Sequence, residues 1–220
     1  MWGGMKMKML FSLVKKDFIL AEKYLFIIIA FVIGGPIFLT IKLNEIGFTD
    51  GGFISFFITV LFAEYVLFGT VAMAEEKYKG GALLSAMPYT RDVLVEAKYL
   101  FALLVFLFCY ISYTIVAMFF PLSKLNISTV GISLLILTIF WGIIIPLQYK
   151  FGYEKTKYIS WIFVFMSPFI FPRTISLLYA NNISFNFNSS WRNLLLYILS
   201  LIISYISMSI SMKIYSQKDL

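Results

Sequence analysis

The sequence predicts an all-α polytopic membrane protein with six transmembrane helices. Of its 220 residues, 61% are apolar and 13% are charged, whereas a soluble domain has about 45–50% apolar and about 25% charged residues. Six apolar runs are close to or above the roughly 18 residues with which a helix crosses a bilayer. They cover residues 24–41, 53–74, 99–122, 130–147, 158–179 and 194–212. Because these runs are continuous rather than alternating, they are typical of helices and not of barrel strands.

The six predicted spans leave no connection long enough for a soluble catalytic domain, so we expect residues 1–220 to form a single membrane domain. The sequence has no histidine and one cysteine, Cys109, which argues against a zinc or haem site. It also has no GxxxxGK[ST], GxGxxG or HExxH motif, the signatures of phosphate loops, dinucleotide sites and metalloproteases. We therefore expect no catalytic activity and no cofactor in this chain. Energy for any work would come from a bound ATPase or from ions.

Basic residues predict the orientation of the chain, because cytoplasmic segments of membrane proteins are enriched in lysine and arginine. With the N-terminus in the cytoplasm, 14 of the 18 basic residues fall on the inner side. The four on the outer side are Lys42, Lys124, Arg173 and Arg192. We therefore expect both termini to be cytoplasmic. The net charge of +7 is explained by contact with anionic lipid headgroups, so no nucleic-acid partner is predicted.

The N-terminal residues 1–23 have the pattern of an amphipathic helix. One face carries Leu10, Leu13, Val14 and Phe18, and another carries Lys8, Ser12, Lys15 and Lys16. We expect an interfacial helix on the inner leaflet with its lysines at the headgroups. The alternative is a simple cytoplasmic extension of the first span.

The first two spans each contain an unusual residue. Pro36 follows Gly34 and Gly35 in the outer half of the first span, where it is expected to kink or end the helix. Glu64 is near the centre of the second span, where a carboxylate is costly and is expected to face the protein interior or a polar cavity. It could relay protons or contact a cationic substrate. The structural alternative is a protonated or hydrogen-bonded carboxyl that ties helices together.

A densely charged segment, residues 75–98, separates the second and third spans. Residues 75–87 are compatible with a short helix that Gly80 and Gly81 weaken by about 1 kcal/mol each relative to alanine. Pro88 is expected to stop this helix, and Thr90 to cap the next one. Such a segment is a natural contact surface for a partner in the cytoplasm.

The last two spans are predicted to have a bend and a polar face. Pro168 and Pro172, followed by Arg173, indicate a re-entrant or bent outer section of the fifth span. In the sixth span, a serine recurs at i, i+4, i+7 and i+11, on one face of the helix. These serines are Ser200, Ser204, Ser207 and Ser211. They could line a substrate path, but small hydroxylated residues more often allow close helix packing, within the chain or in a dimer.

The chain resembles the permeases of type-II ABC exporters in its six spans, cytoplasmic termini and amphipathic N-terminal helix. The first inner loop adds the pattern E-E-K-x-K-x-x-x-L-L-x-x-x-P-x-x-R-x-x-x-x-x-A-K-Y. The residues that carry this likeness are Glu75, Glu76, Leu83, Leu84, Pro88, Arg91, Lys98 and Tyr99. Within the class, the chain looks like the small permeases of Gram-positive bacteria that export antimicrobial or cytolytic peptides, such as phenol-soluble modulins, or confer immunity to them.

The resemblance implies that the first inner loop is a coupling helix in a cleft of a separate ATP-binding subunit, which would hold ATP and Mg²⁺. Two permease chains, identical or different, would pair around the translocation path. Residues 75–87 would then dock on the ATPase and Arg91 would fix the turn behind them. The residues expected to couple the chain to the ATPase are Glu75, Glu76, Lys79, Leu83, Leu84, Pro88 and Arg91. The bent outer part of the fifth span would correspond to the family's short outer re-entrant helices.

The resemblance thus predicts a permease subunit in a bacterial plasma membrane that expels hydrophobic or amphipathic peptides or drugs. Glu64, Ser200, Ser204 and Ser207 are candidates for the translocation path. Two other classes stay open. A six-span substrate-binding component of an importer would need a defined pocket and would hold a vitamin or metal tightly when purified. An intramembrane enzyme would need a polar partner for Glu64 at a similar depth.

Overall fold

The computed structural model describes residues 2–45, 51–78, 90–120, 122, 125–180 and 190–217. Within these ranges the chain forms six α-helices and no β-strand. The helices are α1 (Trp2–Glu45), α2 (Gly51–Lys77), α4 (Arg91–Phe119), α5 (Ile127–Phe151), α6 (Tyr153–Ala180) and α7 (Ser190–Ser216). Each predicted span coincides with one of these helices over most of its length. The all-α prediction is therefore confirmed for the described part of the chain.

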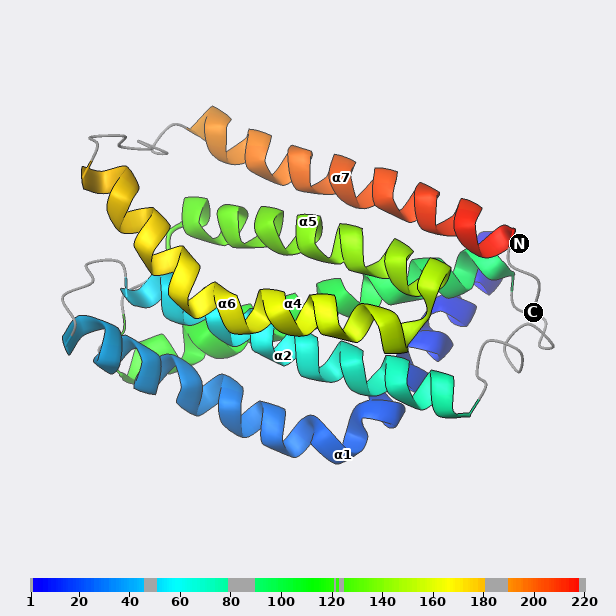
Figure 1. Cartoon of the computed structure of the whole chain (residues 1–220), viewed down its shortest axis with the longest axis horizontal. Helices are drawn as coiled ribbons and strands as arrows, with labels where there is room; N and C mark the ends of the chain where they lie inside the picture. The colour runs from blue at the N-terminus through cyan, green and yellow to red at the C-terminus, as the bar shows by residue number, and fades with distance from the viewer. Residues whose placement is uncertain are drawn as a thin grey trace.

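The helices lie along the long axis of the molecule, and α1 begins at the end of the bundle where α7 finishes (Figure 1). We call this end the terminal end. Contacts between helices divide the bundle into two sets: α1, α2 and α4 pack on one another, while α5 packs on both α6 and α7. The two sets meet mainly where α4 contacts α7 and where α2 contacts α6, which packs on α2 at least as extensively as on α5.

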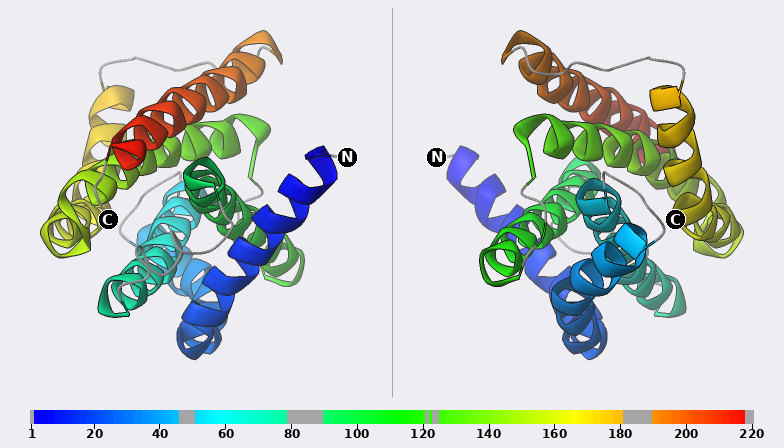
Figure 2. Two further views of the ribbon diagram at one scale, coloured as in Figure 1. Left: turned by 90° about the vertical axis from the view of Figure 1, so that its right-hand side faces the viewer. Right: turned by 90° about the vertical axis from the view of Figure 1, so that its left-hand side faces the viewer.

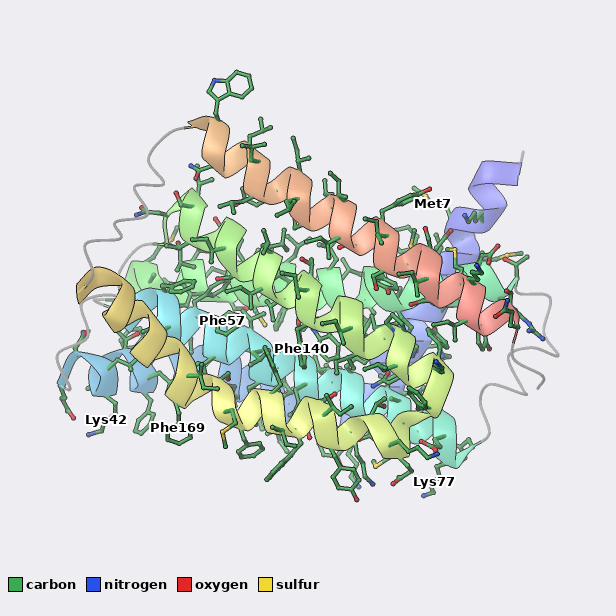
Figure 3. All side chains as sticks on the ribbon, turned by 45° about the horizontal axis from the view of Figure 1, so that its top comes forward. Met7, Lys42, Phe57, Lys77, Phe140 and Phe169 are labelled. Atoms are coloured by element: carbon green, nitrogen blue, oxygen red, sulfur yellow. The ribbon has the colours of Figure 1, made fainter. Side chains whose placement is uncertain are left out.

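The outer surface of the bundle is rich in large apolar side chains, as contact with lipid requires. Phe26, Met118 and Phe119 are largely exposed, whereas Phe57 and Phe140 are buried between helices (Figure 3). Among the described residues, five helices are long and apolar enough to cross a membrane, namely α1, α2, α4, α5 and α7. The chain is thus a multi-pass membrane protein. The sequence-based count of six crossings includes α6 and stays a prediction.

The N-terminal amphipathic segment and the first span form one helix, α1. Figure 2 shows its first part crossing the end of the bundle at an angle to the rest of the helix. The predicted apolar face is directed at the protein: Leu13 and Val14 are buried, and the ring of Phe18 lies 4.9 Å from that of Phe101 in α4. Its amphipathic pattern is therefore explained by packing within the chain. Contact of this segment with lipid headgroups remains a prediction.

Helices α1 and α6 both continue past the prolines within them. The first span does not end at Pro36, since α1 continues to Glu45. In the same way, α6 runs without a break from Tyr153 to Ala180, although its gold C-terminal part turns away from the yellow part (Figure 1). The outer section of α6 was predicted to be either re-entrant or bent, and the structure shows a bent helix. A proline removes one backbone hydrogen bond, and a membrane helix tolerates that loss when its neighbours hold it in place.

Candidate functional site

The predicted coupling segment starts in α2 and ends in α4, at the terminal end. Glu75 and Glu76 occupy the last turn of α2, and Arg91 is the first residue of α4. Thr90 takes the N-cap position with extended backbone angles of φ −71° and ψ 146°, but its side chain makes no capping hydrogen bond. Four of the residues predicted to couple to an ATPase lie outside the described residues. They are Lys79, Leu83, Leu84 and Pro88.

Four charged side chains from three helices meet where this segment joins the bundle. The Lys98 ammonium of α4 lies 2.9 Å from the Glu75 carboxylate of α2 and 3.3 Å from the Asp17 carboxylate of α1. The Lys16 ammonium lies 2.6 Å from Glu75 and 2.9 Å from Asp17. We call these four residues the ionic cluster. Each lysine contacts both carboxylates, so the cluster joins α1, α2 and α4 through their charges.

The ionic cluster is partly removed from solvent, and Asp17 is its most buried member. Only 1% of the Asp17 side chain and 13% of the Lys98 side chain are exposed. A buried charge is strongly unfavourable unless an opposite charge accompanies it. Glu75 lies just beyond the apolar run of α2, and burial alone would raise its pKa. The ammonium groups of Lys98 and Lys16 outweigh that effect and hold the pKa of the Glu75 carboxyl below its ordinary value.

A cavity of about 230 Å³ lies beside the ionic cluster. All four cluster residues form part of its wall, together with aromatic and amide side chains from the second set of helices. These include Gln148 and Tyr149 of α5, Tyr153 of α6 and Tyr215 of α7. The cavity therefore combines ionic groups with aromatic rings, and it lies between the two sets of helices at the terminal end.

Arg91 connects the start of α4 to the end of α7. Its Nη1 donates hydrogen bonds to the carbonyl oxygens of Tyr215, at 3.0 Å, and Ser216, at 2.9 Å. The last carbonyls of a helix have no partner within that helix, and a cation close to them is favourable. The guanidinium carbon also lies 5.8 Å from the centre of the Tyr215 ring. The structure shows that Arg91 binds a distant helix end. The turn that it was predicted to fix lies outside the described residues, so that role stays a prediction.

Glu64 is buried in α2, and its carboxylate accepts a hydrogen bond from the indole N–H of Trp141 in α5. The Trp141 ring also packs on Phe68, with 4.5 Å between ring centroids. This arrangement matches the structural alternative, in which the carboxyl ties two helices together. It leaves the functional roles of Glu64 untested. An indole N–H donates a hydrogen bond but does not exchange its proton in acid–base chemistry.

The serine face of α7 packs on α5 and α4. Ser207 donates a hydrogen bond of 2.6 Å to the carbonyl oxygen of Gly142 in α5. The Tyr99 hydroxyl of α4 lies 2.6 Å from the Ser207 hydroxyl and 3.0 Å from that of Ser211. Ser200 is buried and bonds within α7, whereas Ser204 is half-buried. Three of these serines are thus in packed positions, as the close-packing interpretation predicts, and a role in translocation is not tested.

A comparison with known protein families decides the class of this chain. Residues 12–216 match the sequence model of a family described as "ABC-2 family transporter protein". The chain belongs to this family. No curated protein and no solved structure was found to match it. The chain is therefore the membrane component, or permease subunit, of an ABC transporter, a kind of component that is generally not catalytic itself.

Sequence reasoning had missed several residues of this ABC-2 permease that make the contacts just described. Asp17 is three residues after Val14 and four after Leu13, so it lies on the apolar face of the N-terminal segment. A carboxylate in that position was a signal of a buried ion pair. Trp141 and Tyr215 gave no such signal, because an aromatic residue in an apolar helix is ordinary. The hydrogen-bond partners of both depend on how distant helices meet.

Proposed function

We propose that this ABC-2 permease exports hydrophobic or amphipathic peptides or drugs, driven by a separate ATP-binding subunit. The observation that carries the proposal is the ionic cluster at the terminal end. Glu75 precedes the α2–α4 connection, Lys98 follows it, and their side chains are 2.9 Å apart. A partner that pushes on this connection would therefore act on a point where α1, α2 and α4 are already joined.

The energy source is proposed to lie outside this chain. The sequence has no phosphate-binding loop, so ATP and Mg²⁺ would be bound by the partner subunit. Closure of a pair of ATPase subunits around ATP would move the α2–α4 connections of two permease chains, identical or different. The helices of each chain would then tilt and expel the cargo.

The nature of the cargo is inferred from the surroundings of the cavity and from the family resemblance. Ionic groups and the rings of Tyr149, Tyr153 and Tyr215 share its wall. An amphipathic molecule matches such a surface on both its polar and its apolar side. This supports peptides or drugs of mixed character over small ions. The resemblance to small Gram-positive permeases favours antimicrobial or cytolytic peptides among them.

A bacterial plasma membrane with both chain ends in the cytoplasm is the proposed location. The start of α1 and the end of α7 share one end of the bundle (Figure 1). Many of the basic residues assigned to the inner side by sequence belong to that end, including Lys77, whereas Lys42 lies at the opposite end (Figure 3). This arrangement supports the orientation expected from the positive-inside rule.

Copurification tests the partnership with an ATPase. A neighbouring reading frame that encodes a phosphate-loop ATPase would favour the exporter. The permease is expressed together with such an ATPase, and the complex is isolated through a tag on the permease. We expect the ATPase to copurify and its activity to change on addition of a cationic amphipathic peptide. Replacing Glu76 with lysine, or Leu83 with aspartate, should weaken copurification without affecting membrane insertion. Unchanged copurification of both variants would contradict a docking role for this segment.

Transport itself is measured in inside-out membrane vesicles that contain the complex in their membrane. We expect a fluorophore-labelled amphipathic peptide to accumulate inside the vesicles when Mg²⁺ and ATP are added, and not when ATP is omitted. Uptake by the permease alone would contradict the proposal. Isolation of the permease with a tightly bound vitamin or metal ion would instead support the importer class.

A further inference from the structure

We propose that the ionic cluster is the joint that moves α1 together with the α2–α4 connection, so that its members are positioning residues for transport. This inference rests on the proposed function, because it says how force applied to the connection spreads within one chain. The cluster would make the first helix of the permease follow the movement of its partner ATPase.

The position of the cluster in the chain is the first argument. Glu75 is in the last turn of α2 and Lys98 is in the second turn of α4, so these two residues flank the connection. Both contact the charged pair of α1, since Lys98 lies 3.3 Å from Asp17 and Glu75 lies 2.6 Å from Lys16. A displacement of the end of α2 or the start of α4 relative to α1 would separate these ions.

The burial of Asp17 is the second argument. Its side chain is 1% exposed, so solvent would not compensate its charge if Lys98 moved away. Separation from Lys98 would leave Asp17 with its neighbour Lys16 alone. Because that state is unfavourable, movement of α1 as one body with α2 and α4 costs less than sliding of α1 past them.

The chemistry of the cluster is the third argument. Apolar side chains of similar volume would hold three helices together at least as well as buried ions do, and often better. Ions instead require that particular groups stay together, which fixes the relative positions of the helices. The adjacent cavity of about 230 Å³ provides space on one side of the cluster. The cluster can therefore travel as a unit without breaking a close-packed interface.

Contacts on both sides of the cluster extend the same linkage. Lys6 of α1 donates a hydrogen bond of 2.7 Å to Glu96 of α4, and Arg91 holds the end of α7. The start of α4 thus contacts the first and the last helix of the chain. The Lys6–Glu96 pair is more exposed than the cluster, and exposed pairs are weak. We therefore assign the coupling of α1 to the cluster.

Two charge-neutral double variants test the proposal. E75Q/K98M removes one carboxylate and one ammonium, and leaves Lys16 and Asp17 paired within α1. K16M/D17N removes the two charges that α1 contributes to the cluster, and leaves Glu75 and Lys98 paired. Each variant removes the ion pairs of the cluster that link α1 to α2 and α4 and leaves the net charge of the cluster unchanged. The matched control is K42M/E45Q, which removes an exposed pair at the opposite end of α1, where the two charges are 2.7 Å apart.

The readout is a distance within the complete complex with its ATPase subunits. Phe11 of α1 and Phe151 at the end of α5, both of which are exposed, are replaced with cysteine and spin-labelled. The buried Cys109 stays in place. Pulsed electron paramagnetic resonance measures the distance between the labels without nucleotide and with Mg²⁺, ATP and vanadate. We expect a shift in the wild-type complex and in K42M/E45Q. We expect loss of that shift in both E75Q/K98M and K16M/D17N. Because K16M/D17N leaves the predicted docking segment 75–87 unchanged, this variant should still bind the ATPase in a complex that hydrolyses ATP.

The outcomes separate this inference from the function on which it rests. If the wild-type chain binds no ATPase, the proposed function fails. If the wild-type complex transports the labelled peptide and either double variant keeps the shift, the joint is refuted. The joint is also refuted if the wild-type complex transports the peptide but shows no shift in the distance between the labels. If one double variant does not accumulate in the membrane, the other decides.

Discussion

Lys98, like Lys16, forms ion pairs with two carboxylates at the terminal end. Its ammonium group contacts Asp17 and Glu75, and it lies 5.9 Å from the centre of the Phe68 ring. A lysine has three N–H donors and a flexible stem, so one ammonium group can satisfy two carboxylates on different helices. The residue therefore compensates two negative charges at once, and one of them, on Asp17, is almost fully buried.

Replacement of Lys98 with methionine should destabilise the protein strongly. The change leaves two carboxylates to share Lys16, and breaking a buried ion pair costs about 3–5 kcal/mol. Thermal unfolding in detergent, followed by tryptophan fluorescence, measures the loss. The variant Lys42→Met provides the control, because that lysine forms an exposed pair and its loss should cost about 0–1 kcal/mol. Equal melting temperatures for the two variants would contradict the importance of burial.

The hydrogen bond between Trp141 and Glu64 gives a second prediction at the scale of residues. Replacement of Trp141 with phenylalanine removes the indole N–H and leaves a buried carboxyl without this donor, at a cost of about 1–3 kcal/mol. In a chain that already carries Glu64→Leu, the same replacement should cost less, because no carboxyl remains to be satisfied. Unfolding measurements on the two single variants and the double variant give the coupling energy. A coupling energy near zero would contradict the bond.

Among the helices, α5 and α7 make the most extensive contact in the described structure. Small residues explain how closely they approach. A Cβ atom added at Gly142 would lie 3.4 Å from the Cβ atom of Ser207, which is ordinary van der Waals contact. Ser207 also donates its hydroxyl to the Gly142 carbonyl. The close approach of the two helices therefore depends on small side chains at both positions.

Residue size at Gly142 should decide whether α5 and α7 remain packed. Gly142→Ala adds one methyl group at ordinary contact distance and should be tolerated. Gly142→Leu should force α7 away and lower stability by about 1–3 kcal/mol, as overpacking usually does. Melting temperatures of the two variants in the same detergent check the prediction. A leucine variant as stable as the alanine variant would show that α7 does not pack here as described.

At the scale of the whole molecule, the arrangement of the helices predicts which residues face each side of the membrane. The side chains of Lys42 and Lys77 lie at opposite ends of the bundle (Figure 3). In intact cells, a membrane-impermeant maleimide should label Lys42→Cys, and should label Lys77→Cys only after the membrane is opened. Cys109 is buried and should give little background. Labelling of Lys77→Cys in intact cells would contradict the predicted orientation, because it would place that end of the bundle outside the cell.

Much of the fold follows from the sequence because the bilayer imposes a simple rule on apolar segments. Uninterrupted runs located the helices, and Thr90 was correctly placed at the start of α4. Pro36 was expected either to kink or to end the helix, and α1 continues past it. The sequence could not decide between these outcomes, since a proline weakens a helix locally while the surrounding helices decide whether it ends.

The candidate site was less predictable than the fold. The charged segment that contains Glu75 and Arg91 was singled out, but the partners of both residues come from distant parts of the chain. Asp17 is 58 residues from Glu75 in sequence, and Arg91 is 124 residues from Tyr215. Such pairs depend on the crossing of helices, which apolar periodicity does not encode.

The division of the bundle into two sets of helices has a consequence for how the chain could be assembled. Because α1, α2 and α4 precede α5, α6 and α7 in sequence, each set is one uninterrupted half of the polypeptide. A gene split between the codons for α4 and α5 would encode two fragments, and each would keep most of its own interhelical packing. Coexpressed halves should therefore reconstitute the permease.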